Sequence, residues 1–170
     1  MKNLNVTAKI QICSYDELHP KEKKLIDNAK DACSRAYAPY SQFHVGAAAL
    51  LANGEIVTGN NQENAAFPSG LCAERTALFY ANSKYPEQAV QALAVAAYTQ
   101  GDFLEHPISP CGACRQVILE TEMRYRNPIR IFLYGKSEIY IIEGIINLLP
   151  LAFRTIDGNA DNTDEADLRK

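Results

Sequence analysis

Apolar residues recur along the chain at two periods, which predict where helices and strands lie. Spacings of three and four positions predict three main helices and a short one, at residues 20–36, 72–83, 111–122 and just before 148–150. Pro20 suits an early position of the first helix, and the turn-forming run 37–41 ends it.

Shorter apolar runs predict the strands of one sheet. Five strands are expected, at residues 45–51, 55–59, 90–99, 129–134 and 139–142. Asn53-Gly54, between the first two, is a strong hairpin signal. An apolar alternation over 4–12 hints at one more short strand before the first helix. The order of elements predicts a single-domain α/β fold, an α-β-α sandwich with a central mixed five-stranded sheet.

The composition is that of an ordinary soluble globular domain. The 170 residues suffice for one domain with its own core, and 47% are hydrophobic and 22% charged. A net charge of -3 gives no general attraction to DNA or RNA, so nucleic acid is not expected as the main ligand. We expect no membrane span, no signal peptide and a cytoplasmic location, because no apolar run has the necessary length.

The chain is expected to form one folded domain followed by a tail. The domain should extend over residues 1–156, with 1–19 as an N-terminal extension. Residues 157–170 are acidic and almost devoid of apolar side chains, so we expect them to be mobile.

Three of the five cysteines have the spacing of metal ligands. Cys111 and Cys114 open a predicted helix, and a separation of three places both sulfurs on one face of its first turn. The positive end of the helix favours the thiolate form. Cys72 opens another predicted helix. An odd number of cysteines favours metal binding or free thiols over a disulfide framework, and Cys13 and Cys33 are interpreted as core residues.

Glu74, two residues after Cys72, is the candidate proton carrier. Residues two apart on a regular helix point about 200° away from each other, so Cys72 is expected at the helix cap, where it and Glu74 can face one site. Three cysteine ligands with an open fourth position are typical of catalytic zinc, whereas structural zinc usually has a fourth protein ligand. Arg75 and Arg115 are expected to donate to the thiolates and offset their excess negative charge.

Several longer segments resemble the small homotetrameric cytidine deaminases. Cys-x-Glu followed by Pro-Cys-x-x-Cys is the pattern of zinc deaminases. The matching segments are residues 37–48, 61–65, 72–77, 110–116 and 148–153. The resemblance covers most of the chain, from about residue 29 to 153, and implies a cytidine deaminase-like catalytic domain that assembles as a homotetramer.

The resemblance also implies an activity and its metal. Cytidine and deoxycytidine would be deaminated to uridine and deoxyuridine with release of ammonia, in pyrimidine salvage, by a zinc-activated hydroxide. Cys72, Cys111 and Cys114 would hold one Zn²⁺ per subunit. Glu74 would carry protons from water to ring N3 and to the leaving amine.

The substrate contacts implied by the resemblance are spread over the chain. Asn61 and Glu63 would bind the ribose hydroxyls, chiefly the 3′-hydroxyl. Phe43 would pack on the pyrimidine, and the backbone amide of Ala73 would hold the carbonyl oxygen of the base. Phe153 would reach the pocket of a neighbouring subunit.

The sequence departs from the family's pattern in three places. His44 stands where proline is common, Phe67 stands where tyrosine is common, and the N-terminal stretch is longer. The change at Phe67 removes a hydroxyl near the site and bears on packing between subunits.

Two other functions stay open from the sequence alone. In a structural-zinc module, His106 or His44 would complete the site and Glu74 would be incidental. A deaminase of nucleotides, tRNA or an aminopyrimidine antibiotic agrees less well, because Cys72 as first ligand fits the nucleoside group and Glu63 beside the sugar would repel a phosphate.

Overall fold

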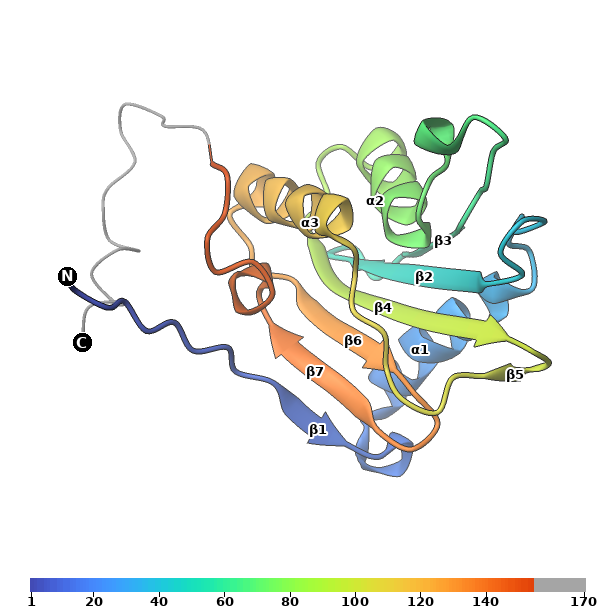
Figure 1. The fold of residues 1–170 in the computed structure, drawn as a ribbon, viewed down its shortest axis with the longest axis horizontal. Coiled ribbons are helices and arrows are strands. Elements are labelled where there is room, and N and C mark those ends of the chain that lie inside the picture. The colour runs from blue at the N-terminus through green and yellow to red at the C-terminus, as the bar shows by residue number, and fades with distance from the viewer. Residues whose placement is uncertain (155–170) are drawn as a thin grey trace.

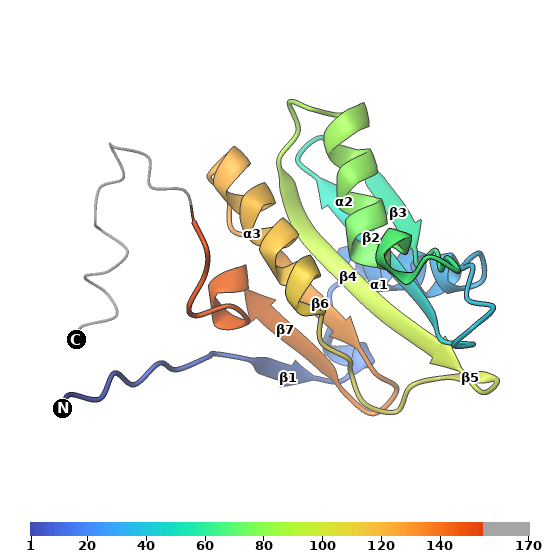
Figure 2. The same cartoon turned by 45° about the horizontal axis from the view of Figure 1, so that its top comes forward.

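The computed structural model describes residues 1–154, so the expected tail at 157–170 and the end of the expected domain lie outside it. One sheet runs through the molecule. Helices α2 (Ala73–Lys84) and α3 (Gly112–Tyr125) cover one face, and α1 (Pro20–Cys33) covers the other (Figures 1 and 2). The predicted α-β-α sandwich is confirmed. No helix within residues 1–154 combines the length and the apolar character needed to cross a bilayer.

Within residues 1–154 the sheet has seven strands, two more than expected. They are β1 (Gln11–Cys13), β2 (His44–Leu51), β3 (Ile56–Asn60), β4 (Val90–Thr99), β5 (Asp102–Phe103), β6 (Arg130–Tyr134) and β7 (Ile139–Glu143). Their order is β1-β7-β6-β4-β2-β3, with β5 beside β4. The β4–β6 pair is parallel, and the other strand pairs are antiparallel.

The two added strands are too short for an apolar pattern to reveal them. The hint over residues 4–12 overlaps β1 only at Gln11 and Ile12, and residues 1–10 have no regular structure. β5 has two residues, which pair back on β4 after a tight turn at Gln100-Gly101, where both residues have positive φ (52° and 88°).

The main helices lie close to their predicted positions and differ from them chiefly at their ends. α1 ends at Cys33, three residues early, and α3 continues past residue 122 to Tyr125. α3 ends there because Arg126 adopts the left-handed conformation, with φ of 49°. The short helices at the edges of the fold are 3-10 turns, at Tyr15–Glu17, Phe67–Ser69 and Ile145–Asn147.

Alternate residues of β4 supply the two layers of the core. Leu93 and Val95 pack with α2 and α3, whereas Ala94 and Ala96 face α1. Small side chains on the second face let α1 approach the sheet closely. A Cβ at Gly46 would lie 2.0 Å from the Ala29 carbonyl oxygen, so a larger residue there would push α1 away.

Strand direction brings the starts of α2 and α3 to one edge of the sheet. β3 and β4 are both antiparallel to β2, so they end at the same edge. α2 follows the loop after β3, α3 follows the loop after β4 and β5, and β2 begins there after the loop 37–43. The carboxyl ends of strands in such sheets are where ligands usually bind.

Candidate active site

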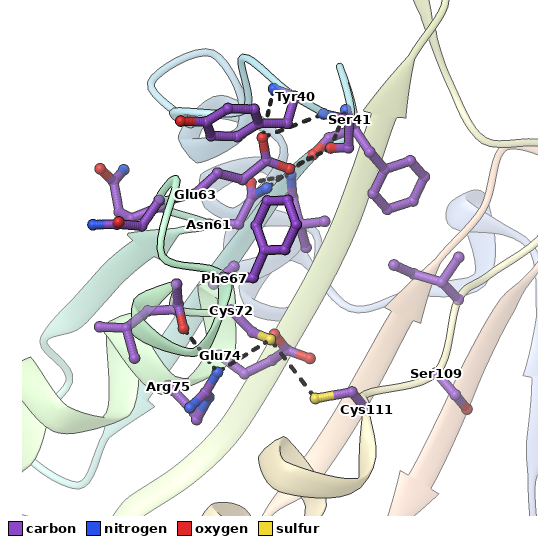
Figure 3. Close-up of a pocket in the computed structure, with 18 residues that line it drawn as sticks. Tyr40, Ser41, Asn61, Glu63, Phe67, Cys72, Glu74, Arg75, Ser109 and Cys111 are labelled. Atoms are coloured by element: carbon purple, nitrogen blue, oxygen red, sulfur yellow. Dashed lines mark hydrogen bonds between the residues drawn. The ribbon is translucent and has the colours of Figure 1, made fainter.

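A pocket of about 790 Å³ opens at this edge (Figure 3). The loop before β2, the loop after β3, the first turn of α2 and the loop before α3 line it. Eight of the predicted site residues contribute to the lining: Phe43, Asn61, Glu63, Cys72, Ala73, Glu74, Arg75 and Cys111. Strand topology therefore gathers most of the predicted site from segments far apart in the sequence.

The three predicted metal ligands meet at the floor of this pocket. The Cys72 and Cys111 sulfurs are 3.7 Å apart, the Cys111 and Cys114 sulfurs are 3.4 Å apart, and all three lie within 4.8 Å of one another. Cys72 and Cys111 are the N-cap residues of α2 and α3 and have extended backbones, as expected for Cys72. The positive ends of two helices thus point at the sulfurs and favour thiolates. Three thiolates are a soft donor set that suits zinc, so these residues fit the metal.

Arg75 lies against this sulfur cluster. Its Nη2 donates to the Cys72 sulfur at 3.6 Å, and its Nε is buried with no hydrogen-bond partner among the described residues. Hydrogen bonds from Cys114 and then Arg75 lower the pKa of Cys72 to about 5, whereas the same contact with Cys72 raises the pKa of Cys114. Arg75 therefore places a positive charge, with a further N–H donor, beside the negatively charged thiolates.

Arg115 is placed differently from the prediction. Its Nε donates to the Pro110 carbonyl at 2.8 Å, and its Nη1 donates to the Leu148 carbonyl at 2.7 Å. These bonds hold the start of α3 to the segment after the 3-10 turn at Ile145–Asn147 and use backbone oxygens, not sulfur. The pairing of Arg115 with the Leu148 carbonyl could not be foreseen from sequence, because the two residues are 33 positions apart.

Glu74 is almost fully buried, with 4% of its surface exposed, beside the cysteine cluster (Figure 3). Burial raises the pKa of its carboxyl above the ordinary range, and the neighbouring Cys72 thiolate acts in the same direction. A carboxyl whose pKa is raised takes up a proton more readily and can return it in a later step. Its position suits acid-base chemistry at the cluster.

The sugar-binding residues predicted from the resemblance are held by the loop before β2. The Glu63 carboxylate accepts hydrogen bonds from the backbone N–H of Tyr40 at 2.9 Å and from the N–H and hydroxyl of Ser41 at 3.3 Å and 2.5 Å. The Asn61 side chain donates to the Phe43 carbonyl at 2.9 Å and accepts from the Val45 N–H at 2.8 Å.

Ser41 is a site residue that sequence reasoning missed. It lines the pocket and bonds the Glu63 carboxylate, and its hydrogen bond is the main reason that the pKa of Glu63 is lowered. It lies inside the matching segment 37–48, but nothing in its spacing marked it, since its partner is 22 positions away.

Phe153 does not contribute to the pocket of its own chain. It is 80% exposed and does not line the pocket, while its carbonyl accepts a hydrogen bond from the Gln116 side chain at 2.9 Å. Phe67 lies at the pocket with 76% of its surface exposed and packs edge-on against Tyr40, with ring centroids 6.0 Å apart.

Neither histidine proposed for a structural-zinc site lies at the cluster. His106 is exposed and contacts Glu138 at 3.2 Å, and His44 packs against Tyr98 in a second, smaller pocket. Within residues 1–154 the metal-binding group consists of the three cysteines alone. The structural-zinc interpretation therefore lacks its fourth ligand in this part of the chain.

Known proteins are similar to this chain in sequence and in fold. Residues 19–126 match the family model described as the cytidine and deoxycytidylate deaminase zinc-binding region. A cytidine deaminase from Sporosarcina psychrophila is 52% identical over 143 residues, which covers 79% of this chain and 93% of that protein. The crystal structure of a cytidine deaminase from Burkholderia pseudomallei matches with a TM-score of 0.66 and 40% identity, over 76% of this chain and 97% of that one.

A second crystal structure agrees. The cytidine deaminase of Mycobacterium tuberculosis matches with a TM-score of 0.62 and 35% identity, over 79% of this chain and 98% of that one. The family model covers the segments that carry the three cysteines and Glu74. The chain belongs to the family of zinc-binding cytidine and deoxycytidylate deaminases.

Proposed function

We propose that this protein deaminates free cytidine and deoxycytidine, which with one water give uridine or deoxyuridine and ammonia. The observation that carries the proposal is the buried Glu74 beside three clustered cysteine sulfurs in an open pocket. Reaction at C4 of the base needs an activated water and a group that moves its protons, and this arrangement provides for both.

Cys72, Cys111 and Cys114 would hold one zinc ion. When bound, zinc supplies a Lewis acid that makes water nucleophilic at neutral pH. Arg75 would offset the negative charge of the three thiolates from its position 3.6 Å from the Cys72 sulfur. Arg115 would keep the Cys111 loop in place through the Pro110 carbonyl.

Glu74 would carry the protons of the reaction. It accepts a proton from the attacking water, gives it to ring N3, and passes a second proton to the departing amine. Its burial raises the pKa of the carboxyl, which favours uptake of the proton that Glu74 later returns.

The remaining pocket residues would bind the nucleoside. The Ala73 amide is at the first position of α2, where it has no partner within the helix, so it can donate to the carbonyl oxygen of the base. Phe43 would pack on the pyrimidine, and Asn61 and Glu63 would bind the ribose. The negative charge of Glu63 beside the sugar disfavours a phosphate, which supports nucleosides over nucleotides.

The protein would act as a homotetramer in the cytoplasm, in pyrimidine salvage. Large apolar side chains are exposed at the pocket, on α2 and on the last described segment: Phe67, Phe79, Tyr80, Leu151 and Phe153. Such exposure is typical of a surface that other subunits cover. Phe153 would then reach a neighbouring subunit's pocket. Sedimentation at assay concentrations is expected to give a tetramer, and an active monomer would contradict this.

Turnover of four compounds tests the proposal. Cytidine, deoxycytidine and their 5′-monophosphates are mixed with the zinc-loaded protein, and the change in ultraviolet absorbance is followed. We expect both nucleosides to be converted and both monophosphates to react far more slowly. Faster conversion of the monophosphates would favour a nucleotide deaminase, and no conversion of any of the four would contradict the proposal.

A further inference from the structure

The turn before β2 is built around the hydroxyl of Ser41. This hydroxyl donates to Oε1 of Glu63 at 2.5 Å and accepts from the Phe43 backbone N–H at 3.0 Å. A hydroxyl has one hydrogen to donate, so the Ser41 hydrogen is committed to Glu63 and the oxygen also accepts from the Phe43 backbone. The same oxygen thus fixes a side chain of the loop after β3 and the backbone of its own loop.

Gln42, which lies between Ser41 and Phe43, has an unfavourable backbone conformation. Gln42 has φ of 55°, in the left-handed region that residues other than glycine rarely adopt. The Ser41 hydroxyl and the Phe43 N–H close a turn across it, and the Gln42 N–H donates to the Ala38 carbonyl at 3.0 Å. The hydroxyl therefore helps to hold the conformation that directs Phe43 into the pocket.

The Glu63 carboxylate keeps one free acceptor position. An ionised carboxylate can accept about four hydrogen bonds, two on each oxygen. Oε2 accepts from the backbone N–H groups of Tyr40 and Ser41, and Oε1 accepts from the Ser41 hydroxyl. The free position is therefore on Oε1, the oxygen that Ser41 orients (Figure 3).

Further contacts extend this arrangement to Asn61. The Phe43 carbonyl accepts from the Asn61 side chain, and the Tyr37 backbone bonds Asn61 and Glu63 on either side, at 3.0 Å and 2.8 Å. Phe43, Asn61 and Glu63 thus belong to one hydrogen-bonded unit. Within it, the Ser41 side chain bonds both Glu63 and Phe43.

We propose that Ser41 is the positioning residue for sugar recognition, whose hydroxyl aims the free acceptor of Glu63 at the ribose 3′-hydroxyl and sets Phe43 against the base. This inference rests on the proposed function, since it assumes a nucleoside in the pocket. Ser41 does not take part in the reaction at the base, so it governs substrate affinity and leaves the chemical step alone.

Kinetics with two substrates test the role. For Ser41→Ala we expect KM for cytidine to rise about tenfold, the equivalent of one good hydrogen bond, with kcat within about twofold. With 3′-deoxycytidine, which cannot use Glu63, the rise should be severalfold smaller. Ser41→Thr keeps the hydroxyl, and because residue 41 is exposed its methyl group has room, so KM should return to near wild type. Ser34→Ala, which removes an exposed hydroxyl that donates to the Asp31 carbonyl, is the matched control.

The ionisation of Glu63 gives a readout independent of activity. With carbon-13 labelled glutamate, the carboxyl pKa of Glu63 is measured by NMR in wild type, Ser41→Ala and Ser41→Thr. Loss of a donated hydrogen bond destabilises the carboxylate, so the pKa should rise in Ser41→Ala and return in Ser41→Thr.

The outcomes separate the two proposals. If the wild type converts cytidine but Ser41→Ala has an unchanged KM, the inference about Ser41 is wrong and the proposed function stands. If Ser41→Ala has a lower kcat and a higher KM with both substrates, and Ser41→Thr does not restore either value, the residue only maintains the fold. If the wild type converts no cytidine, the proposed function fails, and an unchanged Glu63 pKa in Ser41→Ala would overturn the local role as well.

Discussion

Gly59 of β3 lies directly against the backbone of Ala77 in α2: a Cβ at residue 59 would come within 2.4 Å of the Ala77 nitrogen. It would also lie 2.8 Å from the Ala73 carbonyl oxygen, which belongs to the first turn of the same helix. Both obstacles are backbone atoms and cannot rotate away. The contact therefore sets the distance of α2 from the sheet, and with it the position of Cys72 and Glu74.

Gly59→Ala should damage both the fold and the metal site. Overpacking of this kind typically costs about 1–3 kcal/mol of unfolding free energy. Because α2 must move and Cys72 moves with it, zinc affinity should fall as well. Urea unfolding and zinc competition with a chelating dye measure the two effects.

Gly112→Ala is the matched control for this substitution. Gly112 opens α3, its φ is not positive, and a Cβ there would meet no atom within 4 Å. Its unfolding free energy should stay level or rise slightly, since alanine favours helix. Equal losses in both variants would mean that glycine flexibility, and not close approach to α2, matters at residue 59.

Glu74→Gln should separate catalysis from metal binding. The amide keeps the size of the side chain but cannot take up a proton, so we expect turnover of cytidine to fall by roughly 10² to 10⁴, the usual contribution of acid-base catalysis. Zinc content should stay near one ion per chain. Stability should not drop, because burial of the Glu74 charge is itself unfavourable.

Cys72→Ala supplies the contrasting case. It removes a ligand and should lose zinc and thermal stability together. Zinc per chain and cytidine turnover, measured for both variants, decide the matter. Wild-type turnover by Glu74→Gln would refute the assigned mechanism.

Arg75→Gln should shift the pH dependence of the reaction. The substitution removes a cation 3.6 Å from the Cys72 sulfur, so the thiolate cluster keeps more of its negative charge. The extra negative charge disfavours loss of a proton from any group beside the cluster, so the pKa of that group rises. The acidic limb of the pH profile of kcat/KM should therefore move to higher pH by roughly one unit. Arg115→Gln is the comparison, since Arg115 bonds backbone carbonyls and its loss should leave the limb in place. A limb that does not move in Arg75→Gln, with zinc retained, would make Arg75 a structural residue.

Alkylation of the cysteines should report metal removal. Cys33 is buried, and burial raises its pKa to about 11, so it should stay unmodified by iodoacetamide at pH 8. In zinc-loaded protein only the half-buried Cys13 should react, and slowly, because its pKa is also raised. After treatment with a chelator, Cys72 and Cys111 should become reactive. Peptide mass spectrometry identifies the modified residues, and equal rates with and without chelator would exclude these two as ligands.

Short-range patterns predicted the central fold well. The predicted strand at 90–99 coincides with β4, and the Asn53-Gly54 turn joins β2 to β3. The cap position of Cys72 also followed from sequence, because helical periodicity forbids residues two apart from facing one site. These features depend on neighbours within a few residues.

Contacts between residues far apart in the chain could not be predicted from the sequence. The bond between Ser41 and Glu63 and the bond between Arg115 and the Leu148 carbonyl join segments that meet only after the sheet has formed. β5 was missed because two residues carry no periodicity. For Arg115, proximity to Cys114 in sequence suggested a thiolate partner, but the guanidinium donates to the Pro110 and Leu148 carbonyls instead.

The convergence of two helix starts on one cluster has a consequence for folding. Cys72 and Cys111 are 39 positions apart, and their sulfurs meet only when both α2 and α3 have docked on the sheet. Coordination of the ion by all three cysteines therefore requires both helices to be docked, and it closes a long loop that contains β4. An ion held in this way slows the separation of the two helices. We expect zinc supply to govern how long each copy of the protein survives proteolysis in the cell, in addition to whether it is active.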